Sequence, residues 1–191
     1  ESGGPRGVLP DDDALLDDLA EVLDDTRRHI AQPWSCPLIL LGHSMGGLVS
    51  AAYVLRAQAN RQHDVDALIL SSPALASGLG VLRRVLVALL MRVAPDLALP
   101  NGLDTGKLSH DPAVEAAYRK DRRVHNRISA RLAHFILLNG PRVLDAAPRW
   151  RLPTLLLYAG ADHLVDPAGS RAFAERAPRR VVMAQGFDGL Y

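Results

Sequence analysis

The sequence lacks the features that mark several classes of protein. Its single cysteine, Cys36, excludes an internal disulfide framework and any zinc or iron–sulfur site built from several cysteines. Charge of neither sign is in excess: 22 basic and 21 acidic residues give a net charge of +1, so nucleic acid is not expected as a partner. No apolar run reaches the roughly 20 residues needed to cross a bilayer, and residues 1–10 hold no apolar leader.

The composition that is present is that of a globular domain. The chain has 191 residues, of which 48% are hydrophobic and 23% charged. At about 150 residues per domain, this length predicts one domain with an insertion. Acidic residues and histidines show no metal-ligand spacing such as HExxH, so we expect neither a metal nor a cofactor.

Apolar runs and helical periodicity alternate along both ends of the chain. Apolar residues recur at helical spacing over 11–30, and Pro33 follows. The run 37–41 is wholly apolar, which predicts a strand buried on both faces, as in a parallel sheet. Further strands and helices that we expect are 65–70, 153–158 and 181–183 (strands), and 48–59 and 167–177 (helices). This alternation predicts a three-layer α/β architecture with a mostly parallel sheet.

A long block, residues 74–150, interrupts this alternation. It has helical patterning and almost no strand character, and it is far longer than an ordinary crossover connection. We therefore interpret it as a helical cap inserted between two parts of one core, residues 1–73 and 151–191.

The segment 42–47 (GHSMGG) follows an apolar strand and precedes a helix, which is the context of a nucleophile elbow. Ser44 would sit on a tight turn with its hydroxyl above the sheet edge. Gly42 and Gly46 would avoid collisions where strand and helix nearly touch. The helix N-terminus behind Ser44 favours negative charge, so the Met45 amide is placed to bind an oxyanion.

A nucleophilic serine needs a base and an acid that orients the base. Asp162 follows the third expected strand directly, and ligand chemistry in open α/β sheets occurs at such strand ends. The alternative acid is Asp166, which is also placed to cap the helix that begins at residue 167. We favour Asp162.

None of the seven histidines is well placed as the base. His43 lies inside the elbow, and His163 adjoins Asp162, from which it is expected to diverge. The required position is a loop after the fourth strand, near 186–191. The remaining histidines precede the acid on helical or linking segments and are His29, His63, His110, His125 and His134.

Four segments together resemble the monoacylglycerol lipases, in the lysophospholipase branch of the α/β-hydrolase superfamily. They are GPRG at 4–7, GHSMGG at 42–47, SPAL at 72–75 and LLLYAGADHLVDP at 155–167. The resemblance implies an α/β-hydrolase fold with Ser44 as nucleophile, Asp162 as acid and the Met45 amide as one oxyanion donor. It also implies a histidine about thirty residues after the acid, immediately after Tyr191, and earlier strands with a second oxyanion donor. We therefore expect a chain truncated at both ends and inactive as it stands.

The function that this predicts is hydrolysis of lipid esters, with monoacylglycerol as substrate and an acyl-serine intermediate. A lysophospholipase or a general carboxylesterase shares the same chemistry, and a haloperoxidase or acyltransferase uses the same triad with another acceptor. A non-catalytic binding protein with this fold is the alternative from a different class. The oligomeric state and the acyl length stay open.

The cap carries apolar residues beside arginines. Leu82, Val85, Leu86, Leu89, Leu90 and Val93 lie close to Arg83, Arg84 and Arg92. This pattern suits an acyl-chain tunnel or a surface that touches lipid aggregates, and equally a helix packed on the core with solvated arginines. We expect a cytoplasmic protein with transient membrane contact through the cap, and a leader peptide ahead of residue 1 stays open.

Overall fold

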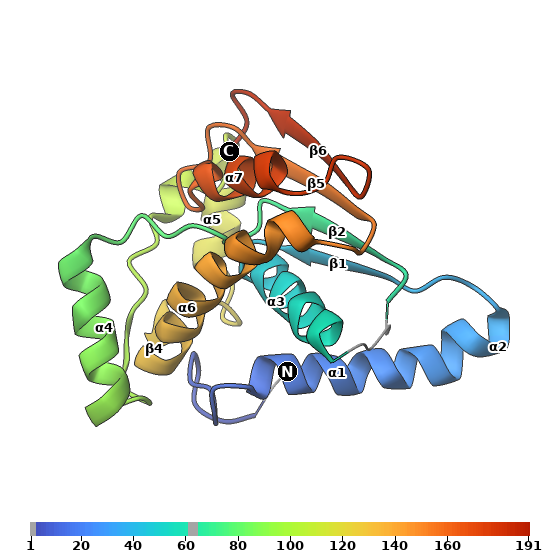
Figure 1. Cartoon of the computed structure of the whole chain (residues 1–191). Helices are drawn as coiled ribbons and strands as arrows, with labels where there is room; N and C mark the ends of the chain where they lie inside the picture. The colour runs from blue at the N-terminus through green and yellow to red at the C-terminus, as the bar shows by residue number, and fades with distance from the viewer. Residues whose placement is uncertain (1–2, 61–64) are drawn as a thin grey trace.

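Four parallel strands form the central sheet of the computed structural model, which describes residues 3–60 and 65–191 (Figure 1). The spatial order is β1–β2–β5–β6. The bounds are Ile39–His43 for β1, Ala67–Ser71 for β2, Thr154–Ala159 for β5 and Val182–Phe187 for β6. All four strands expected from the apolar runs are therefore present, each ending later in the chain than predicted, and all run parallel.

Helices follow the strands as the alternation predicts. They are α1 (Ala14–Thr26), α3 (Met45–Ala59), α6 (Ala130–Ala146) and α7 (Pro167–Arg176). The helix expected over 11–30 begins at Ala14 and continues into a π-helical turn, η1 (Arg27–Ala31), and the short α2 (Gln32–Trp34). It ends at Ser35, which has a left-handed backbone with φ of 49°.

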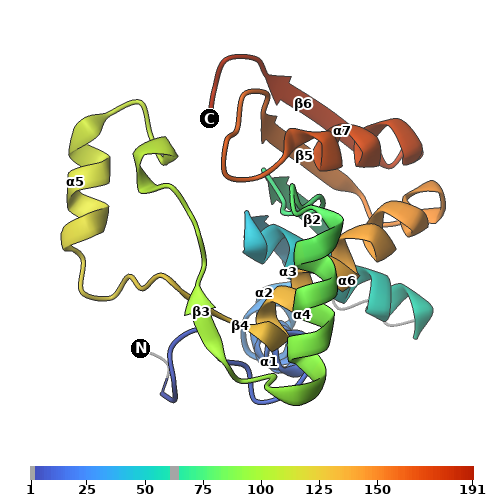
Figure 2. The ribbon, with the colours of Figure 1, turned by 90° about the vertical axis from the view of Figure 1, so that its left-hand side faces the viewer.

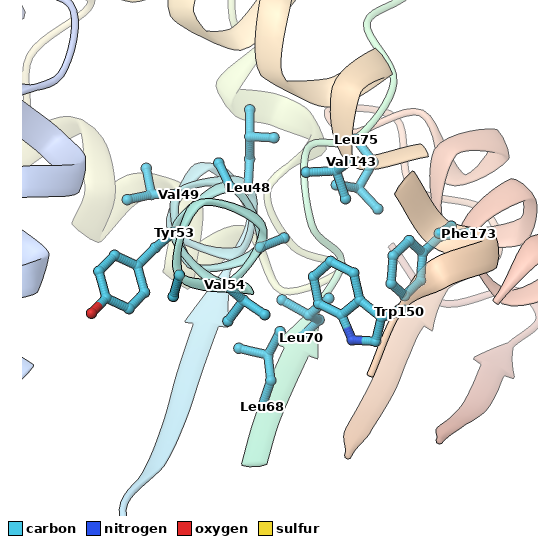
Figure 3. Close-up of a cluster of buried hydrophobic side chains, with 14 of the residues drawn as sticks. Leu48, Val49, Tyr53, Val54, Leu68, Leu70, Leu75, Val143, Trp150 and Phe173 are labelled. Carbon is cyan, nitrogen blue, oxygen red and sulfur yellow. The ribbon is translucent and has the colours of Figure 1, made fainter. Parts of the chain in front are cut away.

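The hydrophobic core lies between the sheet and the helices α3, α6 and α7 (Figure 3). Leu68, Leu70 and Leu156 point from the strands into this layer and are almost completely buried. The rings of Trp150 and Phe173 meet edge to face with centroids 5.1 Å apart. Helix α1 packs outside α3. The layer anchors α3 firmly beneath the turn that precedes it.

The opposite face of the sheet carries exposed apolar side chains. Ile39 and Leu41 of β1 are 51% and 63% exposed, and Met183 of β6 is 67% exposed. The expectation that residues 37–41 are buried on both faces is therefore wrong for the described chain. The reason is that, within residues 3–60 and 65–191, the helices that contact the strands of this sheet, α3 and α7, share one buried cluster on a single face.

The expected insertion contains helices and one small sheet (Figure 2). Before α6 its elements are α4 (Val81–Val93), β3 (Ala98–Pro100), the 3-10 turn η2 (Thr105–Lys107), α5 (Pro112–Lys120) and β4 (Arg127–Ser129). β3 and β4 pair antiparallel. Gly7 of the GPRG segment, with φ of 75°, packs against the backbone of Arg127, and its carbonyl accepts a hydrogen bond from the Ser129 amide (2.8 Å).

Helix α6 shares its core with the segments that flank the block. Its Phe135 and Val143 belong to the main buried cluster, as do Ala147 and Trp150 in and after the 3-10 turn η3 (Ala147–Arg149). Helix α6 also contacts both α3 and α7. The division of the chain at residues 73 and 150 stays a prediction, while residues 130–150 are packed with the sheet layer.

Candidate active site

Ser44 lies on a sharp turn between β1 and α3. Its backbone has φ of 54° and ψ of −121°, a conformation that costs a residue with a side chain of the order of 1–3 kcal/mol and persists only where the surroundings enforce it. Both backbone groups of Ser44 are held: its amide donates to the Ser71 carbonyl (3.0 Å), and its carbonyl accepts from the amides of Leu48 (3.2 Å) and Ala74 (3.0 Å). The side chain is half-buried and lies at the C-terminal end of β1.

The turn is tight because strand and helix backbones touch at Gly42. A Cβ there would lie 2.6 Å from the Gly46 carbonyl oxygen and 2.6 Å from Ser50 Oγ. Gly47 is equally confined, since its Cβ would lie 2.8 Å from the Cβ of Pro73. Gly46 differs from the expectation: among the described residues nothing lies within 4 Å of its Cβ position. The close approach thus depends on Gly42 and Gly47, and Gly47 is the residue that the pattern G-x-S-x-G does not include.

Met45 begins α3, directly after Ser44. The first intrahelical hydrogen bond runs from the Leu48 amide to the Ser44 carbonyl, so the amides of Met45, Gly46 and Gly47 precede the helical ladder. Amides in this position carry the positive end of the helix dipole. The geometry suits the stabilisation of negative charge beside the Ser44 hydroxyl.

The segment 72–76 packs beside the elbow, at the end of β2. Ser72 has φ of 40°, and its hydroxyl accepts a hydrogen bond from the Ala159 amide (3.2 Å). Gly140 of α6 and Gly169 of α7 allow the backbone of this segment to approach closely. A Cβ added at Gly140 would lie 2.5 Å from the Leu75 carbonyl oxygen, and one added at Gly169 would lie 2.6 Å from the Ala76 amide nitrogen. These contacts give a packing reason for the SPAL segment, which the sequence alone does not reveal.

Asp162 lies in the loop after β5. Its Oδ1 accepts hydrogen bonds from the amides of Leu164 (2.8 Å) and Val165 (2.9 Å), so the backbone of the loop holds the carboxylate in place. Within the described chain, Oδ2 of Asp162 has no hydrogen-bond partner. Asp166 instead caps α7 by accepting from the Ala168 amide (2.9 Å). The two acids therefore have the different environments that the sequence suggested.

Parallel pairing brings Ser44 and Asp162 to the same edge of the sheet. His43 pairs with Ser71 and Ser71 pairs with Leu157, so Ser44 is level with the end of β5. One strand, β2, separates β1 from β5, which is two spacings of about 4.8 Å.

Four of the described histidines contact groups other than the Ser44 hydroxyl and the Asp162 carboxylate. Nδ1 of His43 lies 3.1 Å from Ser71 Oγ, beneath the elbow. His163 is exposed, and its ring contacts Tyr191. His29 contacts Asp25 on its own helix, and His125 accepts from the Arg127 amide. His63 lies outside the described residues.

The segment after β6 lies against the loop that carries Asp162. The Ala161 amide donates to the Leu190 carbonyl (3.0 Å), and the Gly160 amide donates to the Phe187 carbonyl (2.8 Å). The approach is close at Gly160, whose Cβ would lie 2.9 Å from Oδ1 of Asp188. Residues 187–191 thus lie beside Asp162, where the sequence predicted the base to follow.

The whole chain, residues 1–191, matches the family described as serine aminopeptidase, S33 (Hydrolase_4). The chain belongs to this family of α/β hydrolases. A monoacylglycerol lipase from Mycolicibacterium smegmatis is 34% identical over all of this chain and 66% of its own length. An uncharacterized abhydrolase domain-containing protein from Dictyostelium discoideum is 29% identical over 94% of this chain and 18% of its own length. The crystal structure of Paleococcus ferrophilus monoacylglycerol lipase superposes with a TM-score of 0.86, at 30% identity, over all of this chain and 70% of that chain.

These likenesses confirm the expected resemblance to monoacylglycerol lipases and the α/β-hydrolase fold. The chain spans just under two thirds of the bacterial lipase and a smaller share of the Dictyostelium protein. No helix within residues 3–60 and 65–191 is long and apolar enough to cross a membrane. The roles of Ser44, Asp162 and Met45 stay predictions.

The elbow's close contacts predict opposite effects at two glycines. Gly42→Ala places a Cβ against backbone atoms that cannot move independently, and we expect it to lower the free energy of unfolding by about 1–3 kcal/mol. Gly46→Ala meets open space on a helix and is expected to be neutral or to stabilise by up to about 1 kcal/mol. Urea unfolding of both variants of the full-length protein checks this, and equal losses at the two positions would contradict the assignment of the close approach to Gly42.

Proposed function

We propose that the full-length protein is a serine hydrolase that cleaves monoacylglycerol to fatty acid and glycerol. The observation that carries this proposal is the backbone of Ser44, held at φ of 54° on a turn between strand and helix with its side chain half-buried at the sheet edge. The likeness to monoacylglycerol lipases over the whole chain supports the substrate class.

The reaction proceeds in two steps through an acyl-serine. A histidine that follows Tyr191 removes the proton of the Ser44 hydroxyl, and Oγ attacks the ester carbonyl carbon. The Met45 amide donates a hydrogen bond to the oxyanion that forms. The intermediate collapses, the histidine returns the proton to the departing glycerol oxygen, and water then hydrolyses the acyl-serine with the same base. Asp162 orients the imidazole and stabilises its cationic form.

The surroundings of Asp162 support its role as the orienting acid. One carboxylate oxygen is occupied by two loop amides, which keeps the side chain in one position. The second oxygen is left for the ring of the base. The hydrogen bonds from Gly160 and Ala161 to residues 187–190 hold the following segment beside it.

Hydrolysis by the full-length protein tests the function and the nucleophile together. A monoacylglycerol, a lysophospholipid and a short-chain nitrophenyl ester are compared, and kcat/KM is expected to be highest for the monoacylglycerol. Ser44→Ala is expected to lower kcat by at least about 10⁴-fold, while Ser109→Ala, on a cap loop, leaves it unchanged. Full activity of Ser44→Ala would contradict the mechanism, and a preference for the lysophospholipid would reassign the substrate.

A second variant pair tests the orienting acid. Asp162→Asn keeps an oxygen for the two loop amides but loses the charge that stabilises the imidazolium, and we expect kcat to fall by about 10⁴-fold. Asp166→Asn is the matched control on the same loop, because asparagine caps a helix as well as aspartate does. Steady-state kinetics and the thermal midpoint of each variant are measured. A larger loss of kcat in Asp166→Asn than in Asp162→Asn would exchange the two roles.

Helix α4 supports contact of the cap with a lipid surface. It contacts α6, yet none of its residues is buried. Its exposed apolar side chains recur at helical spacing and are 50–83% exposed: Val81, Leu82, Val85, Leu86, Leu89 and Val93. Arg83 and Arg92 flank this stripe, and cations beside an apolar face suit a surface of anionic lipid. Together these features favour the lipid-contact interpretation over a helix whose apolar side is covered by the core.

Vesicle binding tests this surface. Leu82→Ser combined with Leu86→Ser in the full-length protein is expected to weaken partitioning onto vesicles with anionic phospholipid by about tenfold or more. The reason is that each substitution removes an aliphatic side chain that would be buried in the lipid. Val22→Ser on α1, a position that is 60% exposed, is the control and should leave partitioning unchanged. Equal binding of the α4 variant and the wild type would remove the cap from the proposed membrane contact.

A further inference from the structure

Three aromatic rings from distant parts of the chain meet beside the loop that carries Asp162. The ring of Tyr191 lies against that of His110, with centroids 3.7 Å apart and planes inclined by 36°. On another side it meets the ring of His163, with centroids 5.4 Å apart and planes inclined by 57°. Tyr191 is half-buried, whereas both histidines are exposed. The tyrosine therefore joins two segments that have no sequence proximity.

His110 belongs to a part of the cap that stands to the side of the sheet. We call residues 101–126, between β3 and β4, the cap arm; they include η2 and α5. Figure 2 shows α5 apart from the sheet and its covering helices, and joined to them through β3 and β4. Near its end, Arg6 donates to the carbonyls of Arg122 (3.0 Å) and Arg123 (3.3 Å). The His110–Tyr191 contact ties the arm to the core at a second place.

The core side of this contact is continuous with the acid. His163 directly follows Asp162. Ala161 directly precedes Asp162, and its amide donates a hydrogen bond to the Leu190 carbonyl. The chain that carries the Tyr191 ring is therefore held to the acid loop from both sides of Asp162. The ring of Tyr191 and the backbone that is hydrogen-bonded beside Asp162 therefore belong to one short segment, residues 187–191.

We propose that His110 and Tyr191 are positioning residues for the reaction. The contact between their rings couples the placement of the cap arm to the placement of the segment that carries the base. The inference rests on the proposed function, because it assumes the base follows Tyr191. A base displaced by a fraction of an ångström loses alignment with Ser44 and Asp162, which lowers kcat with little effect on substrate binding.

The test uses kinetics of the full-length protein on a short-chain soluble ester, which makes the least use of the cap for binding. His110→Ala and Tyr191→Leu are each expected to lower kcat by about 2- to 10-fold, the range that one ring pair supplies, with KM changed by less than twofold. The double variant is expected to be no worse than Tyr191→Leu alone, because Tyr191→Leu already removes the contact with His110. Tyr191→Phe and His110→Phe keep a ring and are expected to stay within twofold of wild type.

The control is His125→Ala, which removes the other histidine of the cap arm, one whose contact is local. Unchanged kcat in His110→Ala, losses that multiply in the double variant, or an effect on KM alone would overturn the proposal. If Ser44→Ala keeps its activity, the proposed function has failed. If Ser44→Ala is inactive and His110→Ala equals wild type, only the coupling between arm and base has failed.

Discussion

The contact between the end of β1 and the first turn of α3 determines the geometry of everything around it. The strand and the helix lie so close that no Cβ fits at Gly42, and Pro73 leaves no room for one at Gly47. A single residue, Ser44, reverses the chain between them. That residue is held in an unfavourable conformation by hydrogen bonds from three directions. The buried layer beneath α3 keeps the helix in place, so the strain at the turn is offset by packing elsewhere.

The parallel sheet carries this local geometry to the rest of the site. Because β1, β2, β5 and β6 run in one direction, their C-terminal ends deliver the elbow, segment 72–76, the Asp162 loop and residues 187–191 to one edge. Glycines at 140, 160 and 169 admit the close backbone contacts that these loops make with one another. The site is thus a property of several strand ends, each positioned by packing remote from the reacting atoms.

Local patterns predicted much of this, and non-local contacts account for what they missed. The sharp turn at Ser44, the four strands, the capping by Asp166 and the position of the Asp162 loop after β5 follow from short stretches whose side chains suffice to identify them. Gly47 is confined by Pro73, which lies 26 residues further along the chain, whereas no described residue approaches the Cβ position of Gly46. A five-residue pattern encodes neither fact. The exposure of Leu41 likewise depends on which elements cover the sheet. The apolar run 37–41 by itself indicates a strand buried on both faces and so does not reveal that exposure.

The proposed reaction depends above all on Ser44 and its immediate surroundings. The direct test is a crystal structure of the full-length protein after reaction with an alkyl fluorophosphonate, whose phosphorus bonds to the serine oxygen as fluoride and the hydroxyl proton leave. We expect phosphorus bonded to Ser44 Oγ, a phosphonyl oxygen within hydrogen-bond distance of the Met45 amide, and a histidine between the adduct and Asp162. An adduct on another residue, or one on Ser44 whose oxygen faces away from the Met45 amide, would contradict it.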